Sequence, residues 1–221
     1  MHDLLKGVRQ VGFDLDETLY PSNAEINERV RTEICRRLIE IKPEFETIEK
    51  AREYFEREYA QLNSGRKVLK KAGLDVFQAG RTMDESLATA KVLDLINPDK
   101  FLADLLARLP SRYDGLFLIT GSPEEIAEKK LRKIGIDPGI FAHKMFSDTP
   151  HVGYKFSGQP FLHMVQRTGE EPGRHAYFGD SKSADILPAK MARMLAVGVW
   201  SNIQEADISI PHIHHLERLL L

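Results

Sequence analysis

Apolar residues along the chain fall into short continuous runs, separated by segments in which they recur every three or four positions. The short runs are rich in β-branched and aromatic side chains, which indicates buried strands. We expect strands at residues 8–15, 115–120, 141–146, 175–178 and 194–199, and an edge strand at 206–210. The helical spacing predicts helices over residues 99–109, 124–134, 159–167 and 184–191, and a last helix after 210. Alternating strands and helices are typical of a parallel sheet covered on both faces.

Residues 22–95 have a different pattern. Charged residues are dense there, apolar residues keep helical spacing, and no strand-like run interrupts them. Turn-forming residues predict breaks near Pro43, residues 63–65 and Gly73. We therefore predict a Rossmann-like, doubly wound α/β core of residues 1–20 and 96–221, with an inserted helical domain of residues 21–95.

Composition narrows the function classes. Among 221 residues, 31 Lys and Arg nearly balance 33 Asp and Glu, which argues against a nucleic-acid partner. The apolar runs are far shorter than the roughly 18 residues of a membrane span, and the first ten residues are too short and too charged for a signal peptide. Cys35 is the single cysteine, so an internal disulfide is excluded. We expect a soluble cytoplasmic protein, a monomer or homodimer, without nucleic-acid or membrane partners.

Polar side chains gather where the predicted strands end. In a doubly wound sheet, ligands bind beyond the carboxyl ends of the strands. The first, second and fourth predicted strands run into polar residues at that edge, and a lysine precedes the helix that leads into the fourth. These residues are Asp14, Asp16, Thr120, Gly121, Ser122, Lys155, Asp180 and Asp185.

This set of side chains suits phosphoryl transfer. Several carboxylates in one place repel each other, and Mg²⁺ relieves such repulsion because it prefers carboxylate, water and phosphate oxygens. The cation and Lys155 would neutralise the phosphoryl oxygens. One carboxylate can attack phosphorus, and a second one two residues away can exchange protons with the leaving oxygen and with water. Thr120 and the backbone amides after it would hold the phosphate.

In order and spacing, these residues resemble the four motifs of the haloacid dehalogenase-like (HAD) superfamily. The motifs are DxDxT, a Ser or Thr after an apolar strand, a Lys, and GDxxxxD. They match Asp14, Asp16 and Thr18; Thr120; Lys155; and Gly179, Asp180 and Asp185. The resemblance covers nearly the whole chain and implies the α/β core and the inserted cap domain predicted above.

The resemblance also implies roles. Asp14 would be the nucleophile and a Mg²⁺ ligand, and Asp16 the general acid and base, binding Mg²⁺ through its backbone carbonyl. Asp180 would be the third protein ligand, and Asp185 would orient a metal-bound water or lie in the outer shell. The phosphate would be held by Thr120, Gly121, Ser122 and Lys155.

Asp16 narrows the chemistry further, because the dehalogenases of the superfamily lack a carboxylate at this position. Its presence favours a phosphatase or a phosphomutase. The helical insertion resembles a C1-type cap, and the segments DLDETLYPS and INPDKFLADLLARL are most similar to the pyrimidine 5′-nucleotidase branch. The resemblance therefore implies a Mg²⁺-dependent phosphatase that acts on a small phosphorylated metabolite, with nucleoside 5′-monophosphates as candidates.

Some alternatives remain open from sequence. A phosphomutase shares all four motifs and is one alternative. A non-catalytic, phosphate-binding regulatory module is another. Phe156 follows Lys155 where the family often has Pro, which leaves Lys144 as a rival for the motif lysine. Ser122 is equally suited to contact phosphate or to cap the following helix. The histidines near the end of the chain are expected in surface or capping roles: His212, His214 and His215.

Overall fold

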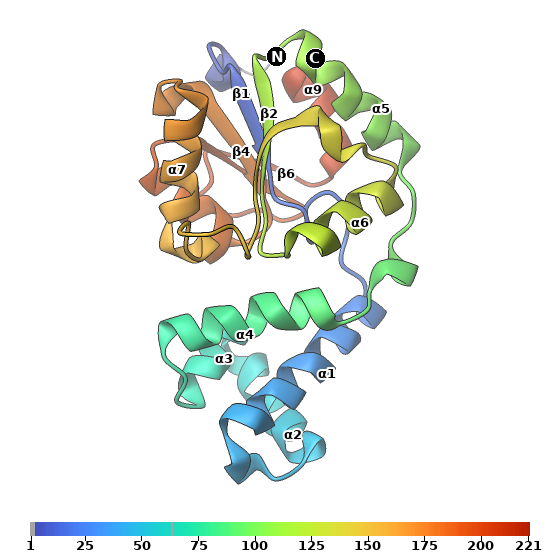
Figure 1. Cartoon of the computed structure of the whole chain (residues 1–221), viewed down its shortest axis with the longest axis vertical. Coiled ribbons are helices and arrows are strands. Elements are labelled where there is room, and N and C mark those ends of the chain that lie inside the picture. The colour runs from blue at the N-terminus through green and yellow to red at the C-terminus, as the bar shows by residue number, and fades with distance from the viewer. Residues whose placement is uncertain (1–2, 63) are drawn as a thin grey trace. The chain divides into compact units, whose positions relative to one another are not determined.

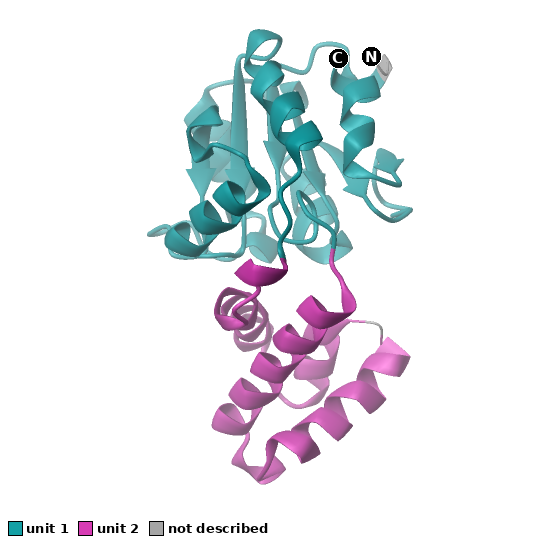
Figure 2. Ribbon diagram, turned by 90° about the vertical axis from the view of Figure 1, so that its right-hand side faces the viewer, with its two compact units in different colours: residues 1–21, 96–221 teal, residues 22–95 magenta. Residues whose placement is uncertain are grey.

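The computed structural model describes residues 3–62 and 64–221. The chain divides into two compact units (Figure 2). One comprises Met1–Pro21 and Ile96–Leu221, and the other is the insertion Ser22–Leu95. Of the breaks predicted inside the insertion, Asn63 lies outside the described residues.

The first unit is built on a six-stranded sheet in which every strand pair is parallel. The strand order is β3-β2-β1-β4-β5-β6, so the chain reverses direction along the sheet at β1. This confirms the predicted doubly wound α/β fold, including the edge strand. The strands are β1 (Gln10–Phe13), β2 (Gly115–Ile119), β3 (Phe141–Met145), β4 (His175–Gly179), β5 (Leu195–Val199) and β6 (Ile208–Ile210).

Helices cover both faces of this sheet, as its almost wholly apolar central strands require. In Figure 1, α5, α6 and α9 lie on one side and α7 on the other. Phe161 and Met164 of α7 and Ala189 of α8 pack with Phe117 and Tyr177 of the sheet in one buried cluster. The helices are α5 (Lys100–Arg108), α6 (Glu124–Ile134), α7 (Gln159–Thr168), α8 (Leu187–Met191) and α9 (Leu216–Leu220).

The strand register brings three loops to one edge of the sheet. Phe13, the last residue of β1, pairs with Leu118 of β2 and with Phe178 of β4. The backbone amide of Asp14 then donates to the carbonyl of Phe178 at 2.8 Å. The residues that follow β1, β2 and β4 therefore leave the sheet side by side, at the position where the strand order reverses.

In the second unit, the described residues form four α-helices, α1 (Ala24–Ile41), α2 (Ile48–Leu62), α3 (Gly65–Lys71) and α4 (Val76–Thr89). They share their own hydrophobic core, which includes Cys35 and Phe55. Cys35 is a buried thiol, and burial raises its pKa to about 11, so it is a packing residue. None of the described helices combines the length and the apolar character needed to cross a membrane.

Candidate active site

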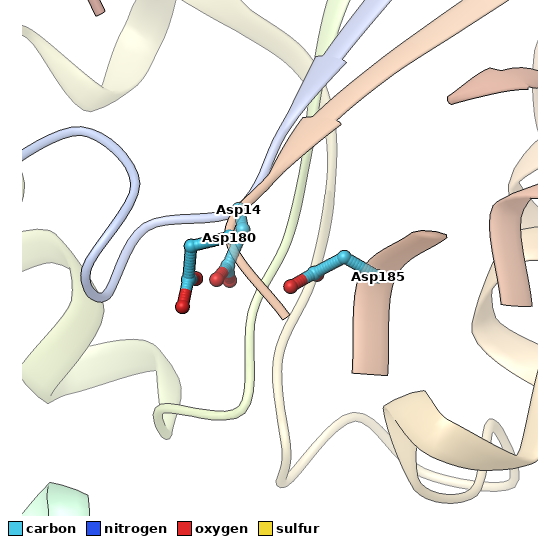
Figure 3. A group of neighbouring side chains, drawn as sticks. All are labelled: Asp14, Asp180 and Asp185. Atoms are coloured by element: carbon cyan, nitrogen blue, oxygen red, sulfur yellow. The ribbon is translucent and has the colours of Figure 1, made fainter. Parts of the chain in front are cut away.

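Three carboxylates converge at the carboxyl edge of the sheet. Asp14 follows β1, Asp180 follows β4, and Asp185 lies in a π-helical turn, Lys182–Ile186, that precedes α8. One oxygen from each carboxylate can be chosen so that all lie within 4.8 Å of one another. Figure 3 shows the three side chains directed toward a common point. Carboxylate oxygens are ligands of divalent cations such as Mg²⁺, so this group is a candidate metal site.

The π-helical turn explains why Asp185 reaches the site. The sequence pattern predicts a regular helix from residue 184, but the amide of Ile186 bonds to the carbonyl of Ser181, five residues earlier. A Cβ at Gly179 would lie 2.4 Å from the Cβ of Asp185, so only glycine permits this approach. The Oδ2 atom of Asp185 accepts from the Ser181 amide at 2.8 Å. The GDxxxxD spacing therefore packs Asp185 against the end of β4.

Lys155 is the cation of this cluster. Its Nζ lies 2.5 Å from Oδ1 of Asp14 and 2.5 Å from Oδ1 of Asp185. Burial alone would lower the pKa of Lys155, but the two carboxylates outweigh burial and raise it. The rival Lys144 lies in β3, where its Nζ contacts Glu128 at 3.3 Å. Of the two lysines, Lys155 is the one that meets the site carboxylates.

The carboxylates of the cluster are poorly compensated by protein charge. Burial, with repulsion from Asp185 and Asp16, raises the pKa of Asp14 to about 8 against the opposing effect of Lys155. Burial, with repulsion from Asp185, Asp14 and Glu17, raises the pKa of Asp180 well above its usual range. A divalent cation would reverse both effects, so the donor set fits Mg²⁺. The hydroxyl of Thr18 donates to Oδ1 of Asp180 at 3.1 Å.

Asp16 lies two residues from Asp14 and has a different environment. Its carboxylate accepts hydrogen bonds from the hydroxyls of Tyr20 at 2.6 Å and Ser122 at 2.7 Å, and it pairs with the ammonium of Lys130. Burial would raise the pKa of Asp16, but the Lys130 charge and these hydrogen bonds lower it overall. The side chain of Asp16 is thus engaged by hydrogen-bond donors and lies outside the group of three carboxylates.

The loop after β2 supplies the remaining predicted residues. Ser122 does not cap α6, because the N-cap is Pro123 and makes no side-chain hydrogen bond; the capping interpretation is wrong, since the Ser122 hydroxyl is committed to Asp16. The Ser122 amide donates to Oγ1 of Thr120 at 3.1 Å. Oγ1 of Thr120 lies 3.4 Å from Oδ2 of Asp16. Gly121 lies between them and is half-buried.

Lys130 is a site residue that sequence analysis missed, as is Tyr20, whose hydroxyl also donates to Asp16. Lys130 is 1% exposed and lies on the inner face of α6. The signal was present in the spacing, because Lys130 falls on the apolar stripe formed by Ala127, Leu131 and Ile134. A lysine at such a position must either reach the surface or find a buried anion.

The histidines near the end of the chain do not belong to the group formed by Asp14, Asp180 and Asp185. Nε2 of His214 is 2.6 Å from Oδ2 of Asp99, the N-cap residue of α5. His212 packs edge-on against Trp200, with 4.6 Å between ring centroids. The indole N–H of Trp200 donates to the carbonyl of Thr18 at 3.1 Å. The two histidines therefore have structural partners, and Trp200 ties the loop after β1 to the end of β5.

A comparison with protein-family models matches residues 8–193 to the haloacid dehalogenase-like hydrolases. The chain belongs to this family. This membership accounts for the order in which the motif residues Asp14, Thr120, Lys155 and Asp180 follow one another along the chain. A comparison with curated protein sequences gives no match for this HAD-like hydrolase.

Solved structures with the same fold include three that cover almost all of this HAD-like hydrolase. A HAD phosphatase from Thermococcus onnurineus is 23% identical, covers 96% of this chain and 98% of its own, and has a TM-score of 0.62. A 2-haloacid dehalogenase from Pseudomonas syringae pv. Tomato DC3000 is 22% identical over 96% and 98%, with a TM-score of 0.56. The putative HAD-hydrolase YfnB from Bacillus subtilis, solved with magnesium, is 16% identical over 96% and 98%, with a TM-score of 0.59.

Proposed function

We propose that this HAD-like hydrolase is a Mg²⁺-dependent phosphatase in which Asp14 attacks the phosphorus of a small phosphate monoester. The observation that carries this proposal is the meeting of Asp14 with Asp180, Asp185 and Lys155 at the edge where β1 and β4 end. A carboxylate beside a cation site and an ammonium is suited to nucleophilic attack on a phosphoryl group.

In the first step, an oxygen of Asp14 forms a bond to phosphorus while the bond between phosphorus and the ester oxygen breaks. Asp16, once protonated, gives its proton to the leaving oxygen. In the second step, ionised Asp16 removes a proton from water, whose oxygen attacks phosphorus and releases Asp14 and inorganic phosphate. The lowered pKa of Asp16 keeps its carboxylate in the ionised form that the second step starts from.

The residues of the acidic group divide into two roles in this proposal. Asp185 already accepts hydrogen bonds from the Ser181 amide and the Tyr177 hydroxyl and pairs with Lys155, which suits an outer-shell position. Asp14 and Asp180, with the backbone carbonyl of Asp16, would hold the cation. Bound Mg²⁺ would neutralise charge on the phosphoryl oxygens. The magnesium in the Bacillus subtilis structure supports the choice of this ion.

Lys155 and the loop after β2 would hold the phosphate. The Lys155 ammonium lies beside Asp14 and can neutralise a phosphoryl oxygen as the Asp14–phosphorus bond forms. Thr120, Gly121 and Ser122 form the turn between β2 and α6, and a turn that leads into the N-terminus of a helix is suited to bind an anion. The insertion Ser22–Leu95 would act as the cap that selects the substrate.

The Asp14→Asn variant tests the nucleophile. We expect a loss of at least about 10³-fold in Mg²⁺-dependent hydrolysis of p-nitrophenyl phosphate, because an amide cannot form the acyl phosphate. Asp104→Asn is the control, since Asp104 lies on the surface of α5 and pairs with Lys100. If Asp14→Asn kept more than a few per cent of the activity, a nucleophilic Asp14 would be untenable.

The substrate is tested with a panel of phosphorylated metabolites. We propose nucleoside 5′-monophosphates as the first candidates, on the strength of the DLDETLYPS segment, so CMP and UMP belong in the panel. A phosphomutase would form isomers of hexose phosphates faster than it releases phosphate, which identifies the alternative of the same fold. A regulatory module would bind Mg²⁺ and hydrolyse none of the panel.

A further inference from the structure

A buried lysine requires an explanation that the proposed steps do not yet give. Lys130 is 1% exposed, and its Nζ contacts the carboxylate of Asp16 and Oγ of Ser122, the latter at 3.0 Å. Removing an ammonium from water is costly even when it is paired, and an apolar residue of similar volume usually serves stability as well or better. Fold stability alone therefore does not account for a lysine at this position.

The contacts of Lys130 belong to a larger arrangement around Asp16. The Lys130 ammonium and the Tyr20 hydroxyl both donate to Oδ1 of Asp16, and the Ser122 hydroxyl donates to Oδ2. The three donors come from three different segments: the loop after β1, the loop after β2, and α6. A carboxylate held at both oxygens by donors from separate segments cannot rotate without breaking one of these bonds.

We propose that Lys130 is a positioning residue that, with the hydroxyls of Tyr20 and Ser122, fixes the carboxylate of Asp16 in the orientation from which it exchanges protons. This inference rests on the proposed phosphatase function, because it assigns Lys130 a task within that reaction. Proton transfer requires donor and acceptor at hydrogen-bond distance in the right orientation, and a small misplacement costs about 10²-fold in rate. Lys130 acts through Asp16 and need not touch the substrate.

Leaving-group dependence separates positioning from a general structural role. p-Nitrophenolate leaves without a proton, whereas the alkoxide of glycerol 3-phosphate needs one. We therefore compare kcat/KM for glycerol 3-phosphate with kcat/KM for p-nitrophenyl phosphate, since both report the reaction up to phosphoryl transfer to Asp14. In Lys130→Met, we expect the ratio of the two values to fall about 10²-fold, because Asp16 loses a donor at Oδ1.

Two further variants distinguish orientation from charge. Tyr20→Phe removes a donor to Oδ1 of Asp16 without changing any charge, and we expect the ratio to fall in the same direction by about tenfold. Lys129→Met is the matched control on the same helix, since Lys129 is exposed and pairs with Glu125. We expect its ratio to equal that of the wild type. If Lys130→Met does not fold, Tyr20→Phe still decides the outcome.

An unchanged or raised ratio in Lys130→Met, or an equal fall for both substrates, would overturn the positioning role. The same holds if Tyr20→Phe leaves the ratio unaltered. Failure of the proposed function has a different signature: the wild type hydrolyses neither substrate, or Asp14→Asn remains active. The positioning role is judged in an active wild type whose Asp14→Asn variant is inactive, so the two failures cannot be confused.

Discussion

Asp14 and Asp16 stand two residues apart in one loop and have opposite surroundings. Asp14 faces two other carboxylates and shares the ammonium of Lys155 with one of them, Asp185. Asp16 faces hydrogen-bond donors and has the ammonium of Lys130 beside it. The pKa of Asp14 is raised to about 8 and that of Asp16 is lowered. Carboxylates whose environments push their pKa values apart are the mark of divided acid–base and nucleophilic roles.

This difference indicates which binding partner each carboxylate is suited to. The Asp14 side has excess negative charge, so we expect a cation from outside the chain to complete it. The Asp16 side is balanced by the chain itself, which fixes a carboxylate in place before any ligand arrives. The following variants test this contrast, from the largest expected effect to the smallest.

Asp16→Asn should destabilise the metal-free protein by about 3–5 kcal/mol, because it leaves the buried Lys130 ammonium without its counter-charge. Urea denaturation in EDTA measures this loss. The double variant Asp16→Asn with Lys130→Met should recover most of it. A stability of Asp16→Asn equal to that of the wild type would contradict a buried ion pair.

Asp180→Asn should weaken Mg²⁺ binding at least about tenfold, because it removes one of the carboxylates available to the cation. Titration calorimetry with Mg²⁺ alone measures this. Asp16→Asn is the comparison, since the side chain of Asp16 is engaged by donors and is not a proposed ligand; its affinity should stay close to that of the wild type. Equal losses in both variants would remove the distinction between the two sides.

Asp14→Asn should have a smaller effect on stability than Asp16→Asn, with the opposite sign. The pKa of Asp14 is about 8 in the folded state, against 3.8 for the free group, so the folded state binds this proton more tightly. Its contribution to stability is present at low pH and is lost as pH rises toward 8. In EDTA, the wild type should lose stability over this range and Asp14→Asn should lose less. Denaturation midpoints at pH 6 and pH 8 measure the difference. An equal change in midpoint between these pH values in the wild type and in Asp14→Asn would contradict it.

A substitution in an exposed ion pair should have the smallest effect of these variants. Lys100 and Asp104 are 2.8 Å apart on the surface of α5, and their side chains are 87% and 61% exposed. Because solvent screens such pairs, Asp104→Asn should leave the urea midpoint and the Mg²⁺ affinity unchanged. A large shift in this variant would show that substitutions anywhere in the unit mimic those at the site.

The strand ends explain how much of the site could be predicted from sequence. Asp14, Thr120 and Asp180 each follow an apolar run, and parallel strands place such residues at one edge regardless of side-chain detail. The sheet and its edge strand were predictable for the same reason, because burial on both faces leaves apolar runs in the sequence.

Contacts that depend on side-chain reach were not predictable. Whether Ser122 caps a helix or turns to Asp16 depends on a rotation that the sequence does not record. Lys130 reaches Asp16 from the inner face of α6, and the helical turn that carries Asp185 is wider than its pattern predicts. In the insertion, the helices and their apolar faces could be predicted, but not which of its side chains would contact a substrate in the proposed reaction.

Trp200 provides a fluorescent probe next to the candidate active site. It is the single tryptophan of the chain, and its indole N–H bonds to the carbonyl of Thr18, in the loop that begins with Asp14 and Asp16. Indole emission responds to the polarity and hydrogen bonding around the ring. Any rearrangement of this loop on binding Mg²⁺ or phosphate should therefore change the intrinsic fluorescence, without an attached dye.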